Sequence, residues 1–188
     1  RICWSCETLP TPTPSGQPTL EDCVRAGDVY TSPADNLPTV NLGLVSIQQA
    51  LLPNGTPVDL SVQDCNDDGM LDVVIPWSQT NAAQLAAIEF SPNICNGRAP
   101  TAVEVVLTHG TPVRMYAFDD DGNLVDSDFL PGSGPIVEVI QLTSASGIRR
   151  ILIDGAEMCI LSICWSCEEF PTPTPTGQTA GDECVDIQ

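Results

Sequence analysis

The stretch Thr101–Val125 reads TAVEVVLTHGTPVRMYAFDDDGNLV, and it decides the fold class. Two runs rich in apolar and β-branched residues, Ala102–Thr108 and Val113–Phe118, are separated by the turn sequence His-Gly-Thr-Pro. Asp119–Asn123 follows them, and Asp-Gly between two alternating runs is a strong hairpin signal. The stretch therefore predicts consecutive antiparallel strands joined by tight turns.

The same pattern continues on both sides, from about Pro38 to Cys164. Short runs rich in Val, Ile and Leu recur about every 8–12 residues, with clusters of Gly, Pro, Asn and Asp between them. The further expected strands are Val40–Ile47, Val58–Val62, Leu71–Ile75, Leu124–Phe129, Ile136–Leu142, Ile148–Ile153 and Met158–Trp165. Together they predict an all-β domain, a β-sandwich or jelly roll.

One segment departs from the strand pattern. Asn81–Phe90 is rich in Ala and has helical spacing of its apolar residues. Asn81 and Gln84 have the spacing of a capping box, and Pro92 follows as a helix stop. We therefore expect one short helix in an otherwise all-β domain.

Three stretches resemble secreted bacterial β-sandwich domains of the jelly-roll, lectin-like kind. They are the opening stretch, then VEVIQLTSASGIRRILIDG, then EMCILSICW, and the resemblance spans about Thr101–Trp165. It is a pattern of turns and strands and carries no catalytic signature. It implies an extracellular binding or structural module, without catalytic residues.

Composition narrows the classes of function further. The 188-residue chain has 25 acidic and 6 basic residues, a net charge of −19, and no Lys. Such a surface repels nucleic acid and anionic membranes, and it suits Ca²⁺, which prefers carboxylate oxygens. No run of 18 apolar residues is present, so no membrane-spanning segment is expected.

Nine cysteines and the Thr-Pro tracts indicate an oxidising compartment, so we expect a secreted or cell-surface protein. No signal peptide is visible, and we expect Arg1 to follow a processing site. Cys65 and Cys95 are expected to pair. Because nine is an odd number, one thiol is left free or joins another molecule.

The two ends of the chain repeat each other. Ile2–Val24 reads ICWSCETLPTPTPSGQPTLEDCV, and Ile163–Val185 reads ICWSCEEFPTPTPTGQTAGDECV, 161 residues later without insertion. Each copy has a short apolar β-type stretch, a Pro-alternating spacer of extended polyproline II type, and a returning Cys. The expected organisation is a hook and linker over residues 1–37, a sandwich over 38–167, and a second hook over 168–188.

The hooks are expected to be stapled by disulfides, Cys6 with Cys23 and Cys167 with Cys184. A four-thiolate zinc site made from the two Cys-x-x-Cys pairs is the alternative. The Thr residues of the tracts resemble those of O-glycosylated stalks, and the candidates are Thr11, Thr13, Thr172 and Thr174.

The duplication has two interpretations. It is a linker that joins domains in a longer chain, or it mediates head-to-tail assembly. In the second, alternation puts Cys159, Leu161, Ile163, Trp165 and Cys167 on one face of a strand. Ile2–Cys6 repeats its end and is expected to add to a neighbouring subunit's sheet edge. The assembly residues are then Ile2, Cys3, Trp4, Ile163, Cys164 and Trp165.

The best local motif for an ion is the segment Asp64–Asp72. It matches D-x-N-x-D-G-x-x-D, the first nine positions of a calcium loop, and its expected ligands are Asp64, Asn66, Asp68, the Met70 carbonyl and Asp72. Position twelve holds Ile75 in place of Glu, so a distant carboxylate would have to complete the shell. The alternative is a turn without an ion, which is also favoured at Asp119–Asn123.

No set of residues marks a catalytic site. His109 is the only His and is interpreted as a turn residue, and no two acids have a diagnostic spacing. We expect a non-enzymatic extracellular protein that assembles with copies of itself into a filament or surface layer. The alternative is a carbohydrate-binding or adhesin module, which needs exposed aromatic residues such as Tyr30, Trp77 and Tyr116.

Overall fold

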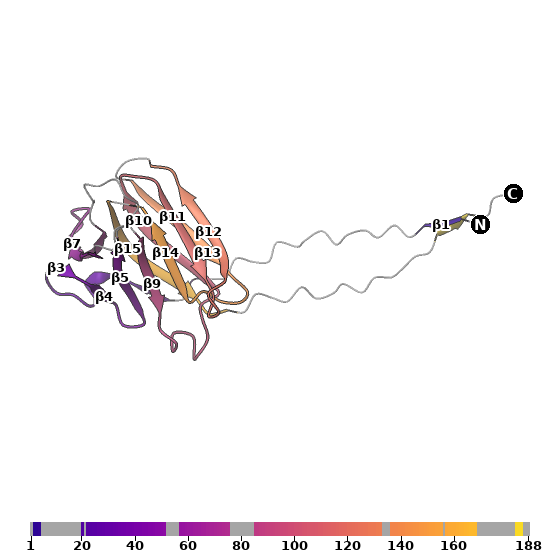
Figure 1. Ribbon diagram of the computed structural model, residues 1–188, viewed down its shortest axis with the longest axis horizontal. Coiled ribbons are helices and arrows are strands. Elements are labelled where there is room, and N and C mark those ends of the chain that lie inside the picture. Colours follow the sequence, from indigo (N-terminus) through magenta and orange to yellow (C-terminus); the bar gives the residue numbers. More distant parts are fainter. Residues whose placement is uncertain are drawn as a thin grey trace. The chain divides into compact units, whose positions relative to one another are not determined.

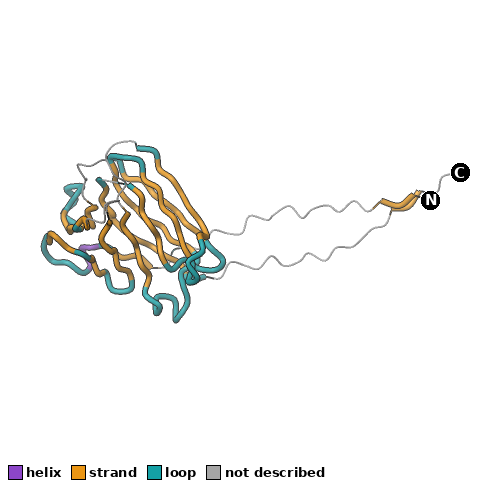
Figure 2. Tube along the Cα trace, viewed as in Figure 1, coloured by secondary structure: helices purple, strands orange, loops and turns teal. Residues whose placement is uncertain are grey.

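The computed structural model describes residues 2–4, 20, 22–51, 57–75, 85–132, 136–155, 157–168 and 183–185. These residues form an all-β sandwich of two seven-stranded antiparallel sheets, and a separate two-stranded pair. The described part of the chain contains one 3-10 turn, η1 (Ala26–Asp28), and otherwise strands and loops (Figure 2). It holds no helix long and apolar enough to cross a membrane. The predicted sandwich is confirmed.

The first sheet has the strand order β13-β10-β15-β8-β7-β3, and β2 pairs with β15 beside β8. Its strands are β2 (Asp22–Val24), β3 (Ala34–Leu37), β7 (Leu60–Gln63), β8 (Asp72–Ile75), β10 (Ala102–His109), β13 (Val137–Thr143) and β15 (Met158–Ser166). The long strand β15 pairs with β10 on one side and with β8 and β2 on the other. Figure 1 shows β15 beside β10.

The second sheet has the order β12-β11-β14-β9-β5-β4, and β6 pairs with β5. Its strands are β4 (Thr39–Asn41), β5 (Val45–Leu51), β6 (Pro57–Val58), β9 (Leu85–Phe90), β11 (Val113–Phe118), β12 (Leu124–Leu130) and β14 (Arg150–Asp154). Most predicted strands are present within a few residues, although the predicted run Val40–Ile47 is divided between β4 and β5 by a turn.

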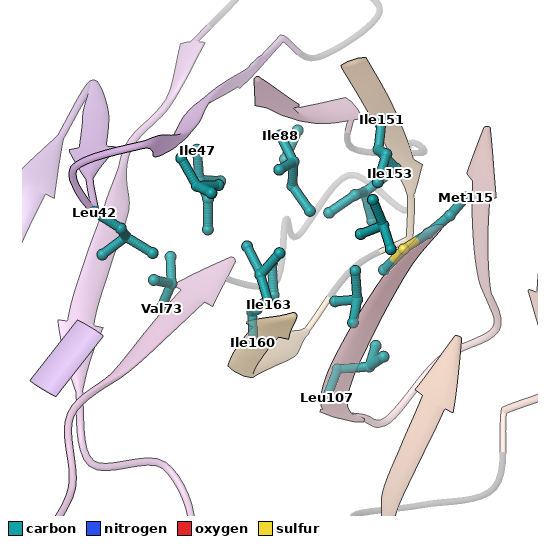
Figure 3. Close-up of a cluster of buried hydrophobic side chains, with 14 of the residues drawn as sticks. Leu42, Ile47, Val73, Ile88, Leu107, Met115, Ile151, Ile153, Ile160 and Ile163 are labelled. Carbon is teal, nitrogen blue, oxygen red and sulfur yellow. The ribbon is translucent and has the colours of Figure 1, made fainter. Parts of the chain in front are cut away.

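Alternation of apolar residues builds the core between the sheets. On β10, Val103, Val105 and Leu107 are buried, and Glu104 and Val106 between them are only partly covered. Ile47, Ile88 and Ile151 of the second sheet point toward Leu107, Ile160 and Ile163 of the first (Figure 3). Burial of these side chains is the main favourable contribution to folding, about 1.5–3 kcal/mol for each.

A bulge in β15 overturns the expected single face of that strand. Its register with β10 shifts between Val106 and Leu107, so that Leu161 has no partner there. Met158 and Ile160 enter the core before the bulge, and Ile163 and Trp165 enter it after the bulge. Because one extra residue reverses the side-chain alternation, Cys159 does not share a face with Ile163 as predicted.

The predicted helix over Asn81–Phe90 is wrong in its second half. Leu85–Phe90 is the strand β9, which pairs with β14 and β5, and residues 81–84 lie outside the described residues. Ala86, Ile88 and Phe90 alternate into the core, where small and large side chains both find space. Pairing on both sides and this burial outweigh the helix propensity of alanine, which is worth only tenths of a kcal/mol per residue.

The sandwich begins earlier than the predicted boundary at residue 38. Pro18–Glu169 is one compact unit, because β2 and β3 already belong to the first sheet. The second unit comprises Arg1–Gln17 and Phe170–Gln188. In it, β1 (Ile2–Trp4) pairs antiparallel with β16 (Glu183–Val185) of the same chain.

Candidate functional site

Among the described residues, three disulfides join segments that are far apart in the sequence. They are Cys23–Cys164, Cys65–Cys159 and Cys95–Cys167, with sequence separations of 141, 94 and 72. The predicted pairings Cys6–Cys23, Cys167–Cys184 and Cys65–Cys95 are therefore wrong. Disulfides of this kind form and persist in oxidising compartments, as the cysteine content had indicated.

The loop Asp64–Met70 folds around its own carboxylates. The Asp64 carboxylate accepts hydrogen bonds from the Asp68 N–H at 3.2 Å and the Gly69 N–H at 2.9 Å. Asp68 Oδ1 accepts one from the Met70 N–H at 2.7 Å. Gly69 has a φ of +81°, which a glycine adopts without strain. The side-chain oxygens thus stabilise the turn itself.

Asp72 is the one buried carboxylate at this loop, with 2% of its surface exposed. The pKa of Asp72 is raised to about 6, mainly by burial and to a smaller extent by the charges of Asp68 and Asp64, although a hydrogen bond from the Cys65 N–H acts in the opposite direction. Among the described residues, no group of three or more His, Cys, Asp and Glu side chains is placed to hold a metal ion. Calcium binding at this loop stays a prediction.

The second acidic turn, Asp119–Asn123, is the predicted hairpin between β11 and β12. The Asn123 side-chain amide, and to a smaller extent the Asn123 N–H, donate hydrogen bonds to the Asp119 carboxylate and hold its pKa below its ordinary value. Arg149 contacts both carboxylate oxygens of Asp120, at 2.6 and 3.2 Å, and also lowers the pKa of that group. Asp119 therefore stabilises the turn itself, and Asp120 holds the hairpin near the end of β9 through Arg149, which also donates to the Phe90 carbonyl oxygen.

His109 lies buried at the end of β10 rather than in an exposed turn. Its Nδ1 is 2.7 Å from the Thr111 carbonyl oxygen, and its Nε2 contacts a Glu138 carboxylate oxygen on β13. Both ring nitrogens thus have partners inside the sandwich. This arrangement fixes the turn after β10 and leaves the imidazole without access to a substrate.

Aromatic side chains gather on the outer face of the second sheet, away from the core. On β11, Val113, Met115 and Ala117 are buried, so Arg114, Tyr116 and Phe118 project outward. Phe129 of β12 is opposite Arg114, and 46% of its surface is exposed. We call these four residues the aromatic face.

Charged and polar groups border the aromatic face. The Arg114 guanidinium lies 5.0 Å from the centre of the Phe129 ring, a cation–π contact. On the neighbouring strands, Arg150 is opposite Phe118, and its Nε lies 3.0 Å from Glu89 Oε1. The four residues of the aromatic face span about 14 Å along β11, enough for a short extended ligand.

A shallow hollow adjoins this face at the ends of β5 and β9. Its lining includes Asn41, Ser46 and Glu89, together with Gly43 and Leu44 of the loop between β4 and β5. Asn41 Oδ1 accepts a hydrogen bond from the Gly43 N–H at 2.9 Å, which stabilises this loop. Glu89 therefore links the hollow to the Arg150 side of the aromatic face.

The sequence had named only part of this site. Tyr116 lies on the aromatic face, whereas Tyr30 packs against the core and its hydroxyl contacts the Asn41 N–H at 3.4 Å. Trp77 lies outside the described residues. Phe118 and Phe129 were missed, although the alternation Arg114-Met-Tyr-Ala-Phe118 already places Phe118 beside Tyr116.

The predicted assembly residues are divided between the two units. Ile163, Cys164 and Trp165 are buried in the sandwich, and β1 pairs within its own chain rather than with a described sheet edge. No contact among the described residues supports strand addition to a neighbouring subunit. Cys6 and the candidate glycosylation sites Thr11, Thr13, Thr172 and Thr174 lie outside the described residues.

No protein-family model matches the sequence, and no curated protein matches it. Among solved structures, CsCBM6-3 from Clostridium stercorarium in complex with cellobiose is similar, with a TM-score of 0.39, 13% identity, and coverage of 78% of this chain and 94% of that chain. CBM29_1, a family 29 carbohydrate binding module from Piromyces equi, has a TM-score of 0.41 and 10% identity, and the match covers 72% of this chain and 90% of that chain. CBM6cm-2 from Cellvibrio mixtus lichenase 5A in complex with cellotriose has a TM-score of 0.36 and 9% identity, and the match covers 79% of this chain and 98% of that chain. The fold assignment rests on the strands and registers of this chain.

Proposed function

We propose that the protein is an extracellular, non-catalytic module that binds a neutral oligosaccharide on the aromatic face. The observation that carries the proposal is that the exposed side chain of Phe129 shares one outer sheet surface with Tyr116 and Phe118. A sugar ring has an apolar face of C–H groups that packs on such rings. Exposed aromatic clusters bordered by polar groups are typical of binding sites.

The polar border supplies the other half of sugar recognition. Hydroxyl groups both donate and accept hydrogen bonds, and the face offers donors on Arg114 and Arg150 and acceptors on Glu89. These groups come from β9, β11 and β14, which pair in one sheet and hold them in a fixed arrangement. Groups that are held in place before binding lose less conformational entropy when a ligand arrives.

The charge of the chain selects the class of glycan. A net charge of −19 gives the molecule a negative field that disfavours polyanionic chains. We therefore expect neutral oligosaccharides to bind in preference to sulfated or uronate-rich ones. The three disulfides support a location outside the cell.

The test compares Phe129→Ala with Val139→Ala after a glycan array has identified a neutral ligand. Val139 is exposed to 43% on the outer surface of the other sheet and so matches Phe129 at 46%. We expect Phe129→Ala to weaken binding about tenfold or more in calorimetry, since an aromatic contact is worth at least about 1.4 kcal/mol when its area is included. Val139→Ala should leave the affinity unchanged.

Equal affinity of the two variants would show that the ligand binds elsewhere on the protein. An array that yields no neutral ligand for the intact protein would reject the proposal as a whole. Both variants replace exposed side chains, so a loss of folding does not obscure the comparison, and circular dichroism verifies it.

A further inference from the structure

The strands β2 and β15 form a covalent junction where the chain enters and leaves the sandwich. Val24 is opposite Ile163, Cys23 opposite Cys164, and Asp22 opposite Trp165. The central pair is the disulfide Cys23–Cys164, while Val24, Ile163 and Trp165 are buried in the core. We call the Ile-Cys-Trp stretch that opens each repeated segment its head, and the Cys-Val stretch that closes it, with the acidic residue before it, its tail. The junction therefore joins the tail of the first repeated segment to the head of the second.

The strands β1 and β16 repeat this junction in the same register. Ile2 is opposite Val185, Cys3 opposite Cys184, and Trp4 opposite Glu183. Adding the 161-residue offset to Ile2 gives Ile163, and subtracting it from Val185 gives Val24. Each pair of the sandwich junction thus recurs at the ends, with Glu183 in the place of Asp22. Here the head belongs to the first segment and the tail to the second.

The cysteines agree with this equivalence. The six cysteines of the three sandwich disulfides all lie in Pro18–Glu169. The other three are Cys3, Cys6 and Cys184, at the repeat positions of Cys164, Cys167 and Cys23. Cys167 is joined to Cys95, which lies in the sandwich and outside the repeated segments. Ile2–Trp4 thus repeats the end of the last sandwich strand, and Glu183–Val185 repeats the first sandwich strand.

We propose that each repeated segment is a connector between two sandwiches of this kind: its head is the last strand of one sandwich, its tail is the first strand of the next, and a free head and a free tail close on each other through a Cys3–Cys184 disulfide. The partner of each end is accordingly a second copy of this domain. The inference goes beyond glycan binding and does not depend on it.

The covalent step is a thiol–disulfide exchange. The Cys3 and Cys184 thiols lose two protons and two electrons and form one S–S bond, and oxidised glutathione is reduced to two molecules of glutathione. The antiparallel register brings the two residues directly opposite each other before the bond forms. The paired strands therefore select which thiols react.

The test uses two shortened proteins that both retain the whole sandwich unit Pro18–Glu169. One comprises residues 1–169 and carries the head with Cys6→Ser, and the other comprises residues 18–188 and carries the tail. They are mixed in a glutathione redox buffer and analysed by non-reducing mass spectrometry. We expect the disulfide-linked heterodimer to exceed the homodimers about tenfold, which corresponds to about 1.4 kcal/mol of strand-pairing preference.

A matched control moves the thiol by one residue. Cys3→Ser with Trp4→Cys in the head protein puts the thiol on the opposite face of the strand, so the heterodimer should fall to the share given by random pairing. Random pairing in the parent mixture, or no difference between the parent and the shifted thiol, overturns the proposal. In the full chain, a peptide map should show Cys3 linked to Cys184, and a Cys3–Cys6 link would also overturn it.

Discussion

Substitution of Asp72 by Asn should remove a large part of the pH dependence of folding below neutrality. Asp72 is buried at the start of β8, and its Oδ2 accepts a hydrogen bond from the Cys65 N–H at 3.3 Å. An Asn side chain keeps the shape and an oxygen acceptor but carries no charge at any pH. The variant therefore isolates the energetic effect of ionising this one carboxyl group.

The magnitude follows from the pKa of Asp72, which burial raises from 3.8 to about 6. Between these values the folded protein holds a proton that the unfolded chain has released. The contribution of Asp72 to stability is therefore fully present below the lower value and is lost as pH rises through the upper one. Each pH unit changes the free energy of unfolding by about 1.4 kcal/mol, and the full span gives about 3 kcal/mol. Solvent at the exposed neighbouring loop screens this effect, so we expect a loss of about 1–3 kcal/mol.

The assay is urea unfolding of both proteins from pH 4 to pH 8, with disulfides intact and a chelator present. The difference in unfolding free energy between the parent and Asp72→Asn cancels the contribution of the other acids. It should change by about 1–3 kcal/mol in favour of the variant as pH rises. A difference that stays flat across this range would refute the argument that burial governs the ionisation of Asp72.

Two further predictions concern turns and ions. Gly147 has a φ of +88°, and a Cβ there would lie 2.7 Å from the Ala99 Cβ, so Gly147→Ala should lower stability by about 2–4 kcal/mol in thermal unfolding. Gly122→Ala, with a φ of +79° but open space around it, should lose only about 1 kcal/mol, and equal losses would contradict the steric argument. If the Asp64–Asp72 loop binds Ca²⁺, the ion at a hundredfold excess over its Kd should stabilise the protein by about 2.7 kcal/mol and leave an Asp64→Ala variant unchanged. If Ca²⁺ leaves the unfolding midpoint of the parent protein unchanged, the loop does not bind the ion.

Strand positions were predictable because burial on one face leaves a two-residue period in the sequence. The run Ala102–Thr108 and its partner Val113–Phe118 show this directly, and the structure places both strands within one residue of the prediction. The Asp-Gly hairpin was predictable because few residues other than glycine adopt the required backbone conformation without strain.

Long-range features were not predictable from local patterns. Leu85–Phe90 satisfies a helical and a strand pattern alike, and its two neighbouring strands decide the outcome. The disulfides join residues 72 to 141 positions apart, so pairing by nearest neighbours along the sequence selected the wrong partners. The bulge at Leu161 arises from the register with β10, which no local signal reveals.

The aromatic face is an intermediate case. Alternation along β11 shows that Arg114, Tyr116 and Phe118 share a side, but the arrival of Phe129 depends on the register of β12. The proposed connector likewise needs both the sequence pattern and the strand register. The duplication is visible in the sequence, whereas the pairing of a head with a tail is visible only in the sheet registers.

The Cys23–Cys164 bond also determines how this domain responds to tension. In the pairing of β2 with β15, only the pair Asp22–Trp165 lies between this covalent bond and the segments that leave the two strands, so a pull on those segments is carried by the bond. The 141-residue separation that it spans, about 500 Å of extended polypeptide, would then bear no load. Under oxidising conditions the residues between Cys23 and Cys164 would thus be shielded from the load, and a reducing agent would expose them to it.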